Sequence, residues 1–203
     1  MVQPRSIGAV REVQTGVWHW ETPHPEWEPG ERWGPEVSSY AIDSGDRLLL
    51  FDPLALPSEI EELAVGRESA IVLTCPWHRR DAIRLAARLG APIYVPPPDP
   101  PDPEPVPGHV FSAGDRLPVG VEAFPGREPN DLVLWVESRR ALVLGDTLMD
   151  RGDGYGLVFA AGPDEPVGQI LEGLQPLLAL PVELVLPTHG SPTDRATLER
   201  ALS

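Results

Sequence analysis

The sequence predicts an α/β fold in which helices pack outside two β-sheets. Short apolar runs typical of strands come in two batches, and each batch is accompanied or followed by amphipathic helices. Polar residues stand where several of these strands end. At 203 residues the chain is long enough to bury a full core, and we expect a single domain over residues 1–203.

The first batch of strands precedes residue 96. The apolar runs predict strands at Ile7–Val13, Val17–Trp20, Val37–Ile42, Leu48–Phe51, Ala70–Leu73 and Ala91–Val95. A helix is expected over Ser58–Val65, where Ser58 and Glu61 have the spacing of a capping box. A second amphipathic helix begins at Asp81 and ends at Gly90.

The second batch of strands lies in the C-terminal half. The predicted strands are Val110–Phe111, Val119–Phe124, Leu132–Val136, Ala141–Leu144 and Val182–Leu186. Helices are expected over Val167–Leu180 and Thr193–Leu202, the second with Asp194 in its first turn. The glycine-rich stretch Asp150–Gly156 is expected to be a loop.

Two segments have no regular period. Residues 18–35 form a Trp/Pro-rich N-terminal loop whose tryptophans are too apolar to stay in water, so it should lie on the body of the protein. It would serve either as a hydrophobic cover or as the rim of a pocket, with His19 or His24 pointing inward. Residues 96–107 are expected to be an extended Pro-rich surface connection.

Charge and composition restrict the class of partner. The formal net charge is −15, and such a field repels nucleic acids and anionic membranes. No stretch resembles a signal peptide or is apolar enough to span a bilayer, so a cytoplasmic location is expected. The remaining partner classes are a small molecule, for which an anion is favoured below, and a second copy of the chain in a homodimer.

The stretch Ile71–Asp81, IVLTCPWHRRD, predicts the site. A buried strand must end at Pro76, which has no N–H to donate to a sheet. The corner that follows carries Trp77, His78 and Arg80 before the next helix begins. A strand that stops at a polar corner before a helix is where α/β enzymes place their chemistry.

In its landmarks the chain resembles the metallo-β-lactamase fold superfamily, which includes glyoxalase II-like hydrolases, from about Val37 to Pro192. The landmarks are Leu49–Asp52, Leu73-Thr74, Phe124-Pro125-Gly126, Leu144-Gly145-Asp146 and Leu186-Pro187-Thr188-His189-Gly190. The resemblance implies a four-layer αββα sandwich of the metallo-β-lactamase type. It also implies a site where a His-x-His-x-Asp-His run and further ligands hold two zinc ions and an activated water.

The metal-ligand motif of the superfamily is degraded in this chain. Aligning His78 with the second histidine places Pro76 on the first, Arg80 on the aspartate and Asp81 on the third histidine. Arg127 stands where the next histidine belongs. The positions that keep a ligand residue are His78, Asp81, Asp146 and His189. A two-metal centre is therefore not expected, and we predict that Arg80 and Arg127 form salt bridges with Asp81 and Asp146 instead.

Three functions remain open. The first is a metal-free protein, catalytically altered or inactive, whose cleft binds a small anion through Arg80, Arg127 and Trp77. The second is a hydrolase of esters, thioesters or phosphodiesters, with His78, Asp81, Asp146 and His189 holding one zinc, manganese or iron ion as the catalytic group. The third is a cysteine hydrolase that uses Cys75 as nucleophile and His78 as base.

Overall fold

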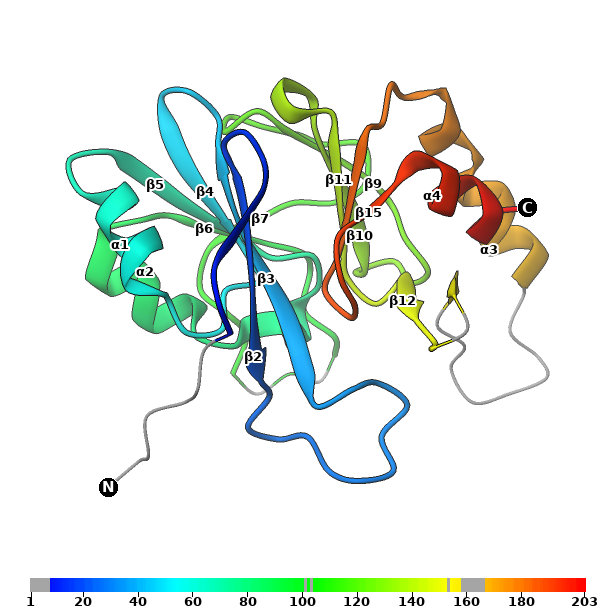
Figure 1. Cartoon of the computed structure of the whole chain (residues 1–203), viewed down its shortest axis with the longest axis horizontal. Coiled ribbons are helices and arrows are strands. Elements are labelled where there is room, and N and C mark those ends of the chain that lie inside the picture. The colour runs from blue at the N-terminus through cyan, green and yellow to red at the C-terminus, as the bar shows by residue number, and fades with distance from the viewer. Residues whose placement is uncertain (1–7, 101, 103, 153, 158–166) are drawn as a thin grey trace.

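Two large sheets lie face to face between two pairs of helices in the computed structural model, which describes residues 8–100, 102, 104–152, 154–157 and 167–203 (Figure 1). Helices α1 and α2 cover the outer face of one sheet, and α3 and α4 cover the outer face of the other. This is the αββα arrangement that the sequence predicts.

The first sheet has the strand order β1-β2-β3-β4-β5-β6-β7. Its strands are β1 (Arg11–Gln14), β2 (Val17–Pro23), β3 (Glu36–Asp43), β4 (Arg47–Phe51), β5 (Glu68–Val72), β6 (Ile93–Val95) and β7 (His109–Val110). Between them lie α1 (Ser58–Ala64), the 3₁₀ helix η1 (Pro76–Arg79) and α2 (Ala82–Leu89). From β4 to β7 the neighbouring strands are parallel, so their carboxyl ends lie along one edge of the sheet.

The second sheet has the order β15-β14-β11-β10-β9-β8. Its strands are β8 (Arg116–Leu117), β9 (Val121–Pro125), β10 (Leu132–Val136), β11 (Ala141–Leu144), β14 (Leu184–Pro187) and β15 (Thr193–Asp194). The short helix η2 (Glu137–Arg139) joins β10 to β11, and β12 (Leu148–Asp150) pairs with β13 (Tyr155–Leu157). The chain then forms α3 (Val167–Leu174), the 3₁₀ helix η3 (Gln175–Ala179) and α4 (Arg195–Ala201).

The core has three apolar layers. One lies between the sheets and includes Tyr40, Phe51 and Leu134, all fully buried. The second packs the first sheet against α1 and α2 through Ile60 and Leu85, and the third packs the second sheet against α3 and α4. Apolar residues on both faces of the central strands explain the continuous hydrophobic runs in their sequence.

Several sequence predictions need correction. Trp18 and Trp20 belong to β2, which confirms the strand predicted over Val17–Trp20 and moves the start of the Trp/Pro-rich loop from residue 18 to the end of β2 at Pro23. The capping box at Ser58 is absent, because the cap of α1 is Pro57, which offers no side-chain acceptor. The helix expected over Val167–Leu180 narrows to 3₁₀ geometry from Gln175, next to a proline that lacks the N–H of an α-helical bond.

Two further predictions concern loops and the N-terminus. Part of the stretch Asp150–Gly156 pairs as the hairpin of β12 and β13. The strand expected over Ile7–Val13 begins outside the described residues, and β1 runs from Arg11 to Gln14. By contrast, α2 ends as predicted, with Gly90 in the left-handed conformation.

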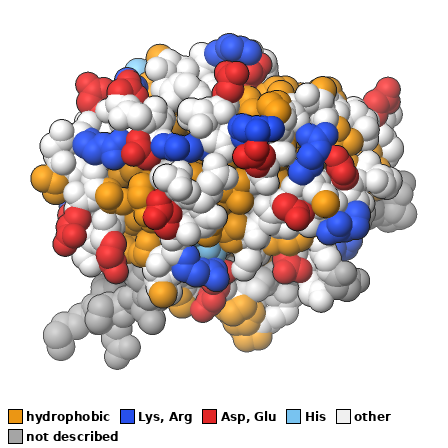
Figure 2. Space-filling model, turned by 45° about the horizontal axis from the view of Figure 1, so that its top comes forward, with side chains coloured by type: hydrophobic (Ala, Val, Ile, Leu, Met, Phe, Trp, Pro, Cys, Tyr) orange, Lys and Arg blue, Asp and Glu red, His pale blue; other side chains and the backbone are white. Residues whose placement is uncertain are grey.

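The surface carries its many charges in mixed order. On the face shown in Figure 2, acidic and basic side chains are interspersed rather than gathered by sign. Ion pairs such as Arg140–Glu183 and Arg116–Glu122 lie at the surface. Within the described residues, no helix has the length and hydropathy needed to cross a membrane.

Candidate functional site

Parallel strand pairing brings the polar strand ends together. Phe51 of β4 lies opposite Val72 of β5, so Asp52 and Thr74 leave the first sheet side by side. Leu144 of β11 likewise lies opposite Pro187 of β14, which brings Asp146 close to His189. A backbone hydrogen bond of 2.8 Å from Leu132 N to Thr74 O links the two sheets here.

Four side chains form a continuous polar chain in the order Asp52, His78, Asp146, His189. His78 Nδ1 lies 3.1 Å from Asp52 Oδ2, and His78 Nε2 lies 3.2 Å from Asp146 Oδ1. The same Asp146 oxygen lies 3.1 Å from His189 Nε2, and its other oxygen accepts a hydrogen bond of 2.7 Å from Trp77 Nε1. Asp52 is fully buried and also accepts hydrogen bonds from the Thr74 backbone N–H and hydroxyl.

The electrostatics of this chain favour a protonated His78. Burial by itself would lower the pKa of His78, but the carboxylates of Asp146 and Asp52 outweigh it and raise the pKa to about 9. For Asp146, burial would raise the pKa, but His78 and His189 hold it well below its usual range. The imidazolium of His78 therefore lies between two carboxylates at neutral pH.

Arg80 does not form the predicted salt bridge. Its Nη1 donates hydrogen bonds to the backbone oxygens of Ser38, at 2.8 Å, and Asp52, at 2.6 Å. Asp81 accepts hydrogen bonds from the Ala55 N–H and the Arg84 guanidinium, both at 2.8 Å, and is not among the residues that line the cavity described below. The candidate ligand Asp81 thus does not join His78, Asp146 and His189.

Arg127 also has partners other than those predicted. Its backbone N–H donates to Thr147 Oγ1 at 3.1 Å, and its guanidinium pairs with Glu128. Asp146, the expected partner, instead has His78, His189 and Trp77 around it. The Arg127 guanidinium is mostly buried, and the residue lines the cavity at the site, to which it adds positive charge.

A cavity of about 630 Å³ opens over this polar chain. Its lining includes the three residues that the sequence predicts to bind a ligand, namely Trp77, Arg80 and Arg127. His78, Asp146 and His189 also line it. The loop between β2 and β3, which extends from the sheets in Figure 1, contributes His24 and Trp33. Trp33 packs edge-on against His189 with ring centroids 5.2 Å apart, so this loop forms a rim of the cavity.

His19 lies outside the cavity. It is buried in β2, where its ring contacts Ser38 Oγ at 2.8 Å and Arg11 Nη2 at 3.3 Å. Ser38 Oγ in turn donates to Gly190 O at 2.7 Å, directly after His189. His19 therefore supports the site from behind rather than facing a ligand.

Acid is expected to destabilise the protein through His19. Burial, with a further contribution from Arg11, lowers the pKa of His19 from the ordinary 6.5 to about 4. Between these two pH values His19 is protonated in the unfolded chain but neutral in the folded chain. The contribution of His19 to the free energy of unfolding is fully present above pH 6.5 and is lost as the pH falls toward about 4. The total loss is about 3 kcal/mol. Urea unfolding of wild type and His19→Gln across this range should show a weaker pH dependence in the variant. Parallel curves would contradict the assignment.

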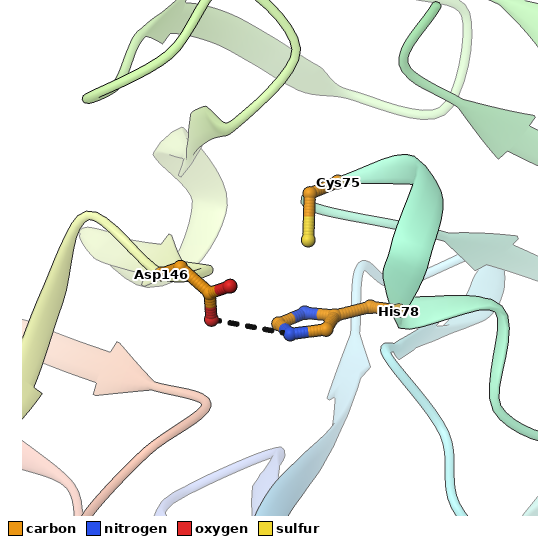
Figure 3. Close-up of side chains that lie close together, drawn as sticks. All are labelled: Cys75, His78 and Asp146. Carbon is orange, nitrogen blue, oxygen red and sulfur yellow. Dashed lines mark ion pairs between the residues drawn. The ribbon is translucent and has the colours of Figure 1, made fainter. Parts of the chain in front are cut away.

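Cys75, which the sequence analysis considered only as a nucleophile, lies beside two of the candidate metal ligands. The donor atoms of Cys75, His78 and Asp146 all lie within 4.8 Å of one another, and the three side chains face a common point (Figure 3). Burial, together with Asp146 and Asp52, raises the pKa of the Cys75 thiol well above its usual range. A neutral thiol is a poor nucleophile, which weighs against the cysteine hydrolase.

Four side chains at the site bring possible metal-donor atoms close together. Cys75, His78 and Asp146 offer sulfur, nitrogen and oxygen donors, and His189 Nε2 adds a fourth donor beside Asp146. Asp52 orients His78 from its other ring nitrogen, as partners of metal-bound histidines commonly do. Arg80 and Arg127 line the same cavity, and the Asp81 carboxylate pairs with Arg84.

Comparison with solved structures identifies the fold. The DIM-1 metallo-β-lactamase has a TM-score of 0.70 at 15% identity, covering 96% of this chain and 94% of that one. A metallo-β-lactamase from Erythrobacter litoralis, with β-mercaptoethanol in its active site, has a TM-score of 0.68 at 15% identity, covering 95% and 93%. TTHA1623 in a di-iron-bound form has a TM-score of 0.63 at 25% identity, covering 84% and 96%.

Sequence comparison adds nothing to this likeness, since no protein-family model and no curated protein sequence matches the chain. The likeness covers nearly the whole chain and includes both sheets and the outer helices. The chain therefore has the αββα sandwich fold of the metallo-β-lactamase superfamily.

Proposed function

We propose that the cavity binds a small anionic molecule, with protein cations in place of a two-metal centre. One observation carries this proposal. Among the residues that the structure describes, every buried side-chain polar atom without a hydrogen-bond partner belongs to a residue that lines the cavity or adjoins one that does. These atoms include Arg80 Nε and Nη2 and His189 Nδ1. Buried polar groups are normally satisfied, so such a cluster indicates a place for a ligand.

The charge of the cavity supports an anion. Arg80 is a permanent cation. The two carboxylates beside His78 raise its pKa to about 9, so its imidazole is protonated at neutral pH. Arg127 adds a third positive group to the lining. His78 lies between Asp52 and Asp146 and offsets part of their negative charge, so the guanidinium groups can attract an incoming anion.

A single-metal hydrolase is the second candidate, favoured by the convergence of Cys75, His78 and Asp146. A divalent ion held by these residues and His189 would supply a Lewis acid and an activated water for hydrolysis of an ester, thioester or phosphodiester. The protein's own contribution would be to orient His78 through Asp52 and Asp146 through Trp77.

Metal analysis combined with anion titration is expected to separate the two candidates. Protein purified without chelator, and again after incubation with Zn²⁺, Mn²⁺ or Fe²⁺, should retain no stoichiometric metal. Its melting temperature should rise with the concentration of small organic anions, because a ligand at 100 times its dissociation constant stabilises the folded state by about 2.7 kcal/mol.

The opposite result is equally specific. One retained ion per chain, lost in both Asp146→Ala and His189→Ala, would overturn the metal-free proposal and favour the hydrolase. Absence of both metal and anion binding would contradict both candidates. Asp81→Ala is the matched control, because it removes a carboxylate from a candidate ligand position whose side chain is directed to Arg84.

A further inference from the structure

The guanidinium of Arg80 is held by one of its nitrogens only. Nη1 donates to two backbone oxygens, Ser38 O and Asp52 O. Nε and Nη2 are buried and have no hydrogen-bond partner among the residues that the structure describes. Burying these two nitrogens without a hydrogen bond costs free energy unless a bound ligand accepts their N–H groups.

The backbone is strained to place this side chain. Arg80 has a φ of 35°, a value that residues with a side chain seldom adopt. Asp52 and Ala55, at 42° and 57°, are also in this region, and Asp52 supplies one of the two oxygens that hold Nη1. Three of the four non-glycine residues with positive φ in the described part of the chain therefore lie at this corner. Strain gathered at one place is typical of a functional site.

The unpartnered atoms have the shape of a carboxylate receptor. Nε–H and one N–H of Nη2 are parallel on the same edge of the planar guanidinium, at the spacing of the two oxygens of a carboxylate. We propose that Arg80 is the anchor of the cavity for a carboxylate, held by two parallel hydrogen bonds from Nε and Nη2. This inference rests on the proposed function and assigns the chemical class of its ligand.

The surroundings favour a monocarboxylate over a phosphate. Glu26, Glu31 and Asp146 line the cavity together with its cations, so a second negative charge on the ligand is stabilised less than the first. The chain as a whole carries a net charge of −15. Apolar side chains complete the lining, namely Trp33, Val37, Trp77 and Met149. The ligand class is therefore an organic acid with one carboxylate and an apolar or aromatic body.

Benzoate, benzamide and inorganic phosphate are suitable probes for the wild-type protein. Benzoate should raise the melting temperature in a saturable way, whereas benzamide, which lacks the charge, and phosphate should not. In ¹H–¹⁵N spectra of the arginine Nε–H groups, benzoate should shift the Arg80 signal. The Arg80 signal can be assigned by through-bond correlation in the wild-type protein, so this measurement remains decisive even if changes at Arg80 impair folding.

Variants then test the anchor directly. Arg80→Met and Arg80→Lys should each weaken benzoate binding by about tenfold or more, because lysine keeps the charge but lacks the planar pair of donors. Arg79→Met is the matched control: it removes the same charge one residue away, on an exposed side chain outside the cavity lining. It should bind benzoate like the wild type.

Failure of the inference is distinguishable from failure of the proposed function. Benzoate binding that persists in Arg80→Met, or that leaves the Arg80 Nε–H signal unmoved, would overturn the anchor while the anion-binding cavity stands. A preference for phosphate over benzoate would overturn the carboxylate class. If the wild type binds none of the anions, both proposals fall together.

Discussion

Replacing Asp52 with alanine is expected to lower the free energy of unfolding by about 3–5 kcal/mol. The Asp52 carboxylate is fully buried and accepts hydrogen bonds from the Thr74 N–H at 2.9 Å and the Thr74 hydroxyl at 2.5 Å. It also pairs with His78 Nδ1 at 3.1 Å. Its removal leaves a buried imidazolium with one carboxylate instead of two and two buried donors without an acceptor, which is the costly way to break an ion pair.

Urea denaturation of Asp52→Ala should show an earlier midpoint with an unchanged slope. Asp46→Ala is the matched control, because it removes the same charge from a side chain that is 72% exposed and contacts Ser44 and Arg47 at the surface. Its effect should stay below about 1 kcal/mol. Equal losses in the two variants would show that Asp52 acts merely as one negative charge among many.

Adding a methyl group at Gly126 is expected to cost about 3 kcal/mol or more. A Cβ at this position would lie 2.0 Å from Asp131 O and 2.4 Å from Thr147 Oγ1, far inside van der Waals contact. Because one of these atoms belongs to the backbone, the loop itself must move. The loop carries Arg127, whose N–H donates to the same Thr147 hydroxyl, so the cavity should change along with the stability.

Gly168→Ala provides the comparison for this variant. Gly168 lies in α3, where an added Cβ meets no atom within 4 Å, and alanine in a helix is favoured over glycine by up to about 1 kcal/mol. Thermal unfolding should therefore separate the two substitutions in sign: Gly126→Ala melts earlier and Gly168→Ala slightly later. A Gly126→Ala protein as stable as wild type would mean that the loop relaxes freely.

The prediction of the fold succeeded where local pattern was enough. Continuous apolar runs marked the strands that are buried on both faces, such as Leu48–Phe51 and Leu132–Val136. The end of α2 followed from Gly90, whose left-handed conformation suits glycine. The Ser58 capping box failed because the cap of α1 is Pro57, so Ser58 already lies inside the helix and its Oγ donates to the Glu59 carboxylate.

The sequence did not reveal which side chains after Thr74 lie on the same side, because that depends on the local helix geometry. In an extended chain Pro76, His78 and Arg80 would point to one side, but Pro76–Arg79 is a 3₁₀ helix. Side chains three residues apart align in such a helix, which places Cys75 rather than Pro76 on the side of His78. Arg80 follows with a positive φ, which ends the 3₁₀ helix before Asp81.

The sequence by itself determined the layers of this protein and the corner where its polar residues gather, because hydrophobic periodicity and strand-ending residues act over a few positions. Only the tertiary structure decided which polar groups meet. Asp52 and His78 come from one sheet, and Asp146 and His189 from the other. Their separations of a few ångströms result from strand pairing between distant segments and from backbone angles at single residues, such as Arg80, that no local pattern specifies.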